Sequence, residues 1–371
     1  MSFGRIGYAR SSGHWHRENA MGQSFESAVM SYLKARSLSP ATGVEYRSTL
    51  SKWSKWGKEV PLESIGRADV REFLDWVHER AIDNEGTNPG RTANKCREHL
   101  RAVLSWAWEE EFIETLPRFP KTKQLRDVAG RHYLTKAELN ALYFATYRMP
   151  RPRGWIHTFD VGRYWRSALV LFFNYGLDTG TVWKWKAVHE PILWRNVTWS
   201  KACPDGRGKK SSPWGWITYR RVKTNKVFIR PMNSAVHSHL KNLQHDDCRP
   251  DAPVLEGGSS RPNVLFEDLC KLANISPKRD VETGEQQAWL LKDLRKTCAT
   301  YYDLHIPESA IEILGHSVTG ITYRHYADRD PLAYRAITTL PQPSAFLSLI
   351  KGHDGECPCC RRRFLHIDRL G

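Results

Sequence analysis

The sequence predicts a mainly α-helical protein of two domains with one small β-sheet, built as a hairpin. With 371 residues, the chain is too long for one ordinary domain of about 100–200 residues. Apolar residues recur at helical spacing through its first third, and two β-rich runs flank a short polar turn between Trp216 and Ile229. A hydrophobic share of 40% and 15 Trp residues argue against disorder.

The segment 22–116 is predicted to be a small helical domain, preceded by a flexible arm over residues 1–21. Ser39 followed by Pro40 is typical of a helix start, with an N-cap and then proline at the first helical position. Four stripes spaced for one helix face are Phe25, Val29, Tyr32 and Leu33; Tyr46, Leu50 and Trp53; Val70, Phe73, Leu74 and Val77; and Cys96, Leu100, Val103, Leu104 and Ala107.

A second, mixed α+β domain is predicted over residues 133–350, after a basic linker at 117–132. It opens with Thr135 and Glu138 in the spacing of a capping box. The apolar run Ala168 to Phe173 predicts a buried helix, and helical spacing resumes at Asn233 after the hairpin. Residues 351–371 form a tail rich in Cys and Arg.

The charge of the chain favours a polyanionic partner. Lys and Arg number 56 against 40 Asp and Glu, a formal charge of +16. This balance predicts nucleic acid rather than a membrane surface, although a basic surface kept for solubility is the alternative. No apolar stretch has the length of a membrane span. Candidate DNA-contacting residues lie in the hairpin region and in the linker, namely Lys209, Lys210, Arg220, Arg221, Lys226, Lys121 and Lys123.

The cysteines indicate a reducing, cytoplasmic environment and no disulfide framework. Most of the eight are isolated, and only Cys357, Cys359 and Cys360 cluster. His353 and His366 lie near that cluster, but the paired half-sites of a structural zinc site are missing. We therefore expect no metal at the tail.

The segment Leu290 to Asp330 carries the residues with chemical potential. Lys292 and Arg295 are three residues apart and share a helix face, while Gly315 can end a helix just before His316. Tyr326 follows ten residues later. Cationic side chains can neutralise charge that grows on phosphate oxygens, and a tyrosine hydroxyl can attack phosphorus as a covalent nucleophile.

These motifs resemble those of the tyrosine recombinase (phage integrase) family. Lys292 to Thr297 is similar to its His-x-x-Arg box with Lys in place of His, and Leu314 to Ser317 matches its Leu-Gly-His box. Tyr326 falls where the family has its nucleophile, and Lys223 where it has a hairpin general acid. The resemblance covers about residues 24–336 and implies a helical, SAM-like core-binding domain followed by a tyrosine recombinase catalytic domain.

One position departs from the family pattern. Where the family has its first catalytic arginine, in a Gly-Leu-Arg-x-x-Glu pattern, this chain has Asp178, and Thr181 replaces the glutamate. An anion beside a phosphate reverses the sign of the interaction and costs several kcal/mol, on the order of the loss of one charged contact. Either catalysis is impaired or another cation compensates, with Lys184, Lys186 and Arg195 as candidates nearby in sequence.

Each candidate also has an ordinary structural interpretation. Lys223 is alternatively a solvated hairpin charge, Arg295 an ion-pair partner of Asp293 or of a neighbour, and His316 a helix-terminal histidine. Lys292 departs from the motif, because the family has a histidine at this position. Tyr323 competes with Tyr326 for the nucleophile's role because the two share a helical face.

The resemblance implies a site-specific recombinase or integrase that cleaves and rejoins double-stranded DNA through a 3′-phosphotyrosyl intermediate. In that scheme Tyr326 attacks, Lys223 protonates the leaving 5′ oxygen, and Arg295, Lys292 and His316 stabilise the transition state. It implies neither metal nor ATP, no small-molecule substrate and no membrane, a homo-tetramer on two recombination sites, and a cytoplasmic, nucleoid-associated protein of a mobile element or its host. A catalytically impaired, sequence-specific DNA-binding protein and a type IB topoisomerase-like enzyme are the alternatives.

Overall fold

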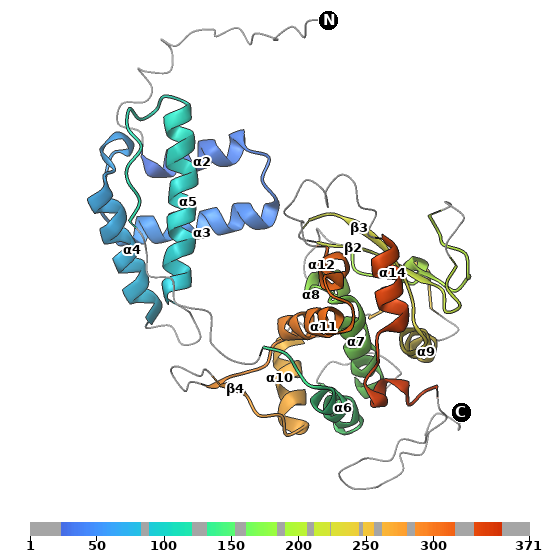
Figure 1. The fold of residues 1–371 in the computed structure, drawn as a ribbon. Coiled ribbons are helices and arrows are strands. Elements are labelled where there is room, and N and C mark those ends of the chain that lie inside the picture. Colours follow the sequence, from blue (N-terminus) through green and yellow to red (C-terminus); the bar gives the residue numbers. More distant parts are fainter. Residues whose placement is uncertain are drawn as a thin grey trace, which may run out of the picture. The chain divides into compact units, whose positions relative to one another are not determined.

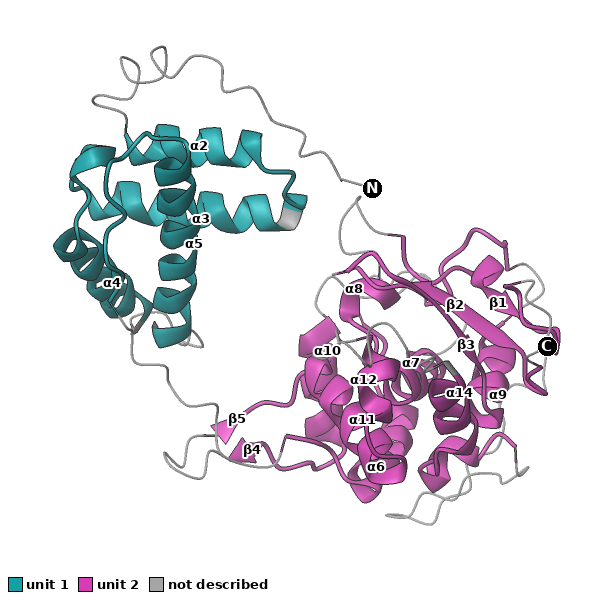
Figure 2. Ribbon diagram, turned by 45° about the horizontal axis from the view of Figure 1, so that its top comes forward, with its two compact units in different colours: residues 1–127 teal, residues 128–371 magenta. Residues whose placement is uncertain are grey.

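The computed structural model describes residues 24–82, 89–120, 132–152, 161–183, 190–205, 211–222, 224–244, 248–255, 262–279, 286–315 and 330–350. The chain divides into two compact units, residues 1–127 and 128–371 (Figure 2). The division falls inside the segment 117–132 that the sequence marks as a linker. The predicted fold class, mainly helical with small antiparallel sheets, is confirmed.

Unit 1 is helical, and its helices follow the predicted apolar stripes. They are α2 (Phe25–Ala35), α3 (Pro40–Trp56), α4 (Arg67–Ile82) and α5 (Pro89–Glu109), with the short 3₁₀ turn η1 (Leu62–Ser64). The Ser39 side chain accepts a hydrogen bond from the Thr42 amide, so the predicted N-cap is confirmed. The stripes converge on one core, in which Phe73 and Leu100 are fully buried.

Unit 2 is built around the central helix α7 (Val161–Tyr175), which contacts α9 and α11 (Figure 1). The predicted capping box at Thr135 and Glu138 is present at the start of α6. The remaining helices are α6 (Lys136–Ala145), α8 (Thr179–Val182), α9 (Ser234–Leu243), α10 (Pro262–Leu272), α11 (Leu291–His305), α12 (Ser309–Leu314) and α14 (Asp330–Thr339), with 3₁₀ turns η2 (Thr146–Arg148), η3 (Trp194–Asn196) and η4 (Ser344–Leu347).

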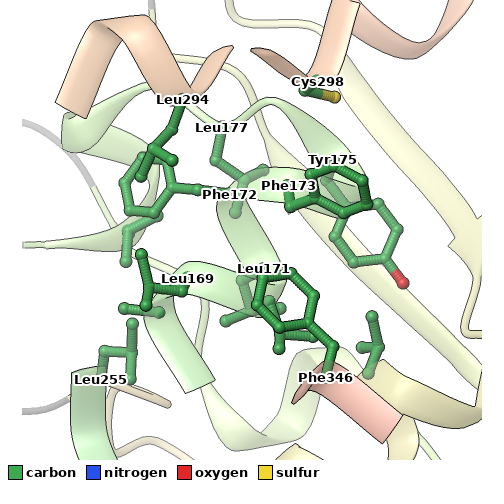
Figure 3. Packing of buried hydrophobic residues seen from close by; sticks show 14 of the residues in the cluster. Leu169, Leu171, Phe172, Phe173, Tyr175, Leu177, Leu255, Leu294, Cys298 and Phe346 are labelled. Carbon is green, nitrogen blue, oxygen red and sulfur yellow. The ribbon is translucent and has the colours of Figure 1, made fainter. Parts of the chain in front are cut away.

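The core of unit 2 surrounds the run Ala168 to Phe173, as predicted. Every side chain of that run is almost fully buried. Figure 3 shows side chains of α7 gathered with Leu294 and Cys298 of α11 and with Phe346 of η4. Burial on all sides fixes the end of α7 relative to α11, since close-packed interiors resist displacement.

The predicted hairpin is the main part of a three-stranded antiparallel sheet of order β1-β2-β3. Its strands are β1 (Val197–Thr198), β2 (Trp216–Arg220) and β3 (Val227–Pro231). Register pairs Arg220 with Val227, which leaves Arg221 as the first residue of the connecting turn. A second pair, β4 (Lys278–Arg279) with β5 (Gln286–Gln287), was not predicted, because two-residue strands leave no alternating pattern to read.

No described helix is long and apolar enough to cross a membrane. The predicted arm 1–21 and tail 351–371 lie outside the described residues, as do Lys121, Lys123, Lys209 and Lys210.

A buried histidine in this core makes stability depend on pH. His239 Nδ1 donates to the Ala235 carbonyl, and its Nε2 accepts from the Tyr143 hydroxyl at 2.9 Å. Burial lowers the pKa of His239 to about 4 from an unfolded value of 6.5. The unfolded chain therefore binds the extra proton first, so unit 2 should lose about 3 kcal/mol of stability as pH falls from 6.5 to 4.

Urea denaturation of the full chain between pH 7 and pH 4 measures this dependence. His239→Gln should flatten the dependence of the free energy of unfolding on pH in that window. Identical slopes for wild type and His239→Gln would contradict the prediction.

Candidate active site

Two sharp backbone turns form the site, here called corners. The first, at Gly176, directly follows the end of α7. Gly176 has a φ of +53°, and its amide donates to the Phe172 carbonyl at 2.9 Å. A Cβ at Gly176 would lie 2.3 Å from Leu314 Cδ2, so only glycine allows the two segments to approach this closely. Buried Leu177 anchors the corner and places Asp178 at the start of α8, where its carboxylate makes no helix-capping bond.

The second corner is the end of α12, where Gly315 ends the helix as predicted. Its φ is +63°, the left-handed C-cap conformation. The Phe228 ring of β3 lies against it, because a Cβ on Gly315 would be 2.2 Å from Phe228 Cζ. The hairpin therefore packs directly on the turn that leads into His316.

Arg295 of α11 ties the two corners together. It donates through Nη1 to the Gly176 carbonyl and through Nη2 to the Leu314 carbonyl at 2.9 Å. Its Nε lies 3.8 Å from Asp178 Oδ1. Asp293, which the sequence offers as an alternative ion-pair partner, instead pairs with Lys278 at 2.7 Å.

Arg221, from the hairpin turn, makes a second bridge across the same corners. Its Nε donates to Asp178 Oδ2 at 3.2 Å, and its Nη1 donates to the Gly315 carbonyl at 3.0 Å. The side chain is 11% exposed, against 15% for Arg295 and 32% for Asp178. Two guanidinium groups thus share one carboxylate at a partly open surface.

The pKa of Arg295 is lowered by its surroundings at this site. Burial is the largest influence on Arg295 and lowers its pKa; nearby Arg221 lowers it further, and Asp178 opposes the shift. With Arg221 and Arg295 charged and Asp178 ionised, these three side chains carry one net positive charge. The site is therefore suited to an anion.

The structure brings together only part of the predicted site. Lys292 lies on α11 with an exposed side chain, one turn before Arg295. Arg220 folds back onto Asn225 of its own turn, and Lys226 is exposed over the Phe228 ring. Both side chains are exposed.

Three predicted residues, Lys223, His316 and Tyr326, lie outside the described residues. Of the proposed compensating cations, Lys184 and Lys186 also lie outside them. Arg195 is ion-paired with Glu190 and Asp251 rather than with Asp178.

Sequence reasoning missed the second arginine beside Asp178, which is the one that hydrogen-bonds to its carboxylate. In the sequence Arg221 is one of several basic residues of the hairpin region, and 43 residues separate it from Asp178. The strand register of the hairpin, which makes Arg221 the first residue of the turn, is the feature that could have singled it out. Among the described residues, no group of three or more His, Cys, Asp or Glu side chains could hold a metal.

The Gly315 corner gives a stability prediction. Gly315→Ala combines an unfavourable φ, about 1–2 kcal/mol, with a clash against the Phe228 ring. Gly57→Ala is a matched control, because Gly57 also has a positive φ but its Cβ would meet only Lys55 O at 4.0 Å. In urea titrations we expect Gly315→Ala to lose at least about 1 kcal/mol more from its unit than Gly57→Ala does from its own. Equal losses would show that Phe228 moves away freely.

Comparison with known proteins agrees with this architecture. Residues 30–111 match the family model of the phage integrase N-terminal SAM-like domain. No curated protein matches the chain in sequence.

Solved structures match over most of its length. A lambda integrase tetramer bound to a Holliday junction matches with a TM-score of 0.56 and 18% identity, over 87% of this chain and 83% of that one. A lambda integrase (75–356) dimer bound to a COC′ core site gives 0.55 and 18%, over 80% and 96%. The Tn1549 transposon integrase (82–397) with circular intermediate DNA gives 0.50 and 17%, over 81% and 95%. The predicted resemblance to the tyrosine recombinase family is confirmed in the fold of the chain.

Proposed function

We propose that this chain, which has the fold of the phage integrases, is a site-specific DNA recombinase that cuts and rejoins strands through a 3′-phosphotyrosine. The observation that carries the proposal is the partly open cluster of Arg295, Arg221 and Asp178. Its net positive charge lies where the turn at Gly176 meets the turn at Gly315, and the second of these turns leads into the rest of the Leu-Gly-His motif. A guanidinium held by backbone carbonyls is already oriented for a phosphate, so little entropy is lost on binding.

The chemistry assigns one role to each remaining candidate. Tyr326 Oη attacks the scissile phosphorus and releases its hydroxyl proton to water. The bond from phosphorus to the 5′ oxygen breaks, and Lys223 donates a proton to that oxygen. Arg295, with Lys292 and His316, offsets charge on the non-bridging oxygens. The phosphodiester energy stays in the covalent link, so the reaction is proposed to need neither metal nor ATP.

The DNA partner and assembly follow from the same proposal. Double-stranded DNA would be held partly by surface cations such as Arg220 and Lys226, which contact phosphates without reading sequence. The lambda integrase matched above is a tetramer on a Holliday junction. We propose a homo-tetramer on two sites for this chain as well.

Covalent trapping on nicked suicide DNA tests the function. Substrates are drawn from the sequences flanking the chain's own gene, and the reaction is run with EDTA and without ATP. We expect a protein–DNA adduct that resists denaturant and disappears on protease treatment. Specific binding without any adduct would contradict cleavage and favour the DNA-binding alternative, which Asp178 supports. Relaxation of a plasmid without the site, as fast as recombination, would favour the topoisomerase alternative.

A further inference from the structure

We propose that Arg221 is the second guanidinium of the phosphate site and that Asp178 is its positioning residue. Arg221 of the hairpin turn would thus supply the positive charge that the family has at position 178. The inference rests on the proposed function for the identity of the anion, a DNA phosphodiester. It concerns a residue that the family motifs do not include.

The first support is the shared frame of the two arginines. Arg295 bonds to the carbonyls of Gly176 and Leu314, while Arg221 bonds to the Asp178 carboxylate and the Gly315 carbonyl. Each guanidinium thus contacts both the segment 176–178, which joins α7 to α8, and the end of α12. A phosphate that reaches Arg295 from the solvent side is therefore within the same cluster as Arg221.

The second support is that the backbone of Arg221 is held in place. The Arg221 amide donates to the Lys226 carbonyl, and its own carbonyl accepts from the Asn225 amide, both at 2.8 Å. Next to it, Val222 packs on α8, where a Cβ at Gly180 would lie 3.4 Å from Val222 Cγ2. A side chain held at both backbone and guanidinium loses little further freedom when an anion binds.

The third support is the charge balance. Two partly buried guanidiniums repel each other, and one carboxylate offsets only one of them. One phosphodiester supplies the remaining negative charge. An arginine at position 178, as in the family pattern, would itself contact the phosphate. Asp178 instead holds the Arg221 guanidinium in position to make that contact.

Asp178 has an opposite possible role, in which it merely quenches Arg295 and suppresses the site. The two roles give opposite results for Asp178→Asn. As a quencher, Asp178 would weaken phosphate contact, and its neutralisation would strengthen that contact. As a positioning residue, its neutralisation loosens Arg221 and weakens the contact.

The experiment measures contact with a phosphate charge directly, by equilibrium binding. Full-length protein is titrated against site DNA in which one phosphate at a time is replaced by a neutral methylphosphonate, scanned through the footprint. Wild type should lose about tenfold or more in affinity at one phosphate per half-site, the scale of one charge-assisted contact. Arg221→Ala should lose most of that sensitivity at the same phosphate, and Arg221→Lys should keep part of it.

Arg195→Ala is the matched control, because Arg195 is also an arginine paired with carboxylates in unit 2 but does not contact Asp178. It should keep the full methylphosphonate sensitivity. Asp178→Arg combined with Arg221→Ala should restore the sensitivity that Arg221→Ala loses. Thermal unfolding of each variant confirms that it is folded.

Two results would overturn the inference. Either Arg221→Ala stays as sensitive as wild type at every phosphate, or Asp178→Asn raises the affinity for the charged phosphate. Because binding is measured without cleavage, the result stands whether or not wild type forms an adduct. Failure of the proposed function shows separately, as the absence of an adduct on suicide DNA.

Discussion

Tyr326→Phe is expected to abolish the covalent protein–DNA adduct while leaving specific DNA binding close to that of wild type. The variant removes one oxygen, the proposed nucleophile, and no other group of the side chain can form a phosphate ester. The measurement is the yield of denaturant-resistant adduct on nicked suicide DNA, with the dissociation constant determined in parallel.

Tyr323→Phe is the matched control for the nucleophile. It makes the same chemical change three residues earlier, on the same predicted helical face. It should form adduct at nearly the wild-type rate. If Tyr323→Phe abolishes the adduct and Tyr326→Phe does not, the two tyrosines exchange roles, and the alignment to the family motif is wrong by one turn.

Arg295→Ala is expected to slow single-turnover cleavage by about 10²–10³, the usual cost of removing one preorganised donor from a developing oxyanion. It also leaves the carbonyls of Gly176 and Leu314 without the donor that joins them, so the unfolding temperature should fall. Arg295→Lys keeps the charge but lacks the forked donor geometry, and should recover only part of the rate.

Lys296→Ala separates this effect from a general loss of charge on α11. Lys296 is the next residue along the helix and its side chain is exposed. It should leave the cleavage rate at saturating protein unchanged. An Arg295→Ala protein that is folded, binds DNA and cleaves at the wild-type rate would remove Arg295 from the site.

Much of the fold could be predicted because it depends on residues that are close together in the sequence. The helices of unit 1 follow from apolar stripes, such as the one through Leu100 and Val103, that meet in one core. The N-cap at Ser39 and the capping box at Thr135 depend on residues three apart, which a sequence shows directly. The Gly315 C-cap is equally local.

The composition of the site could be predicted only in part because its contacts are not local. Arg295 was identified through its motif, yet its bond to the Gly176 carbonyl spans 119 residues. Arg221 reaches Asp178 only because the hairpin turn packs on α8 through Val222. Tertiary packing of that kind leaves no periodicity, so nearness in sequence pointed instead to Lys184, Lys186 and Arg195.

The sequence and the structure therefore lead to different interpretations of Asp178. Read alone, an acid in place of an arginine indicates a disabled site. In the structure it is the shared partner of two arginines, and the three side chains together remain cationic. The same substitution is therefore compatible with cleavage, provided that Arg221 contributes its charge to the bound phosphate.

The most direct test of strand cleavage by this chain is mass spectrometry of the protein trapped on nicked suicide DNA. After digestion with protease and nuclease, the account predicts a single modified peptide in which Tyr326 carries a 3′-linked nucleotide. Tight, site-specific binding with no modified peptide, in wild type and in Asp178→Arg alike, would contradict it and leave a DNA-binding protein on a recombinase fold.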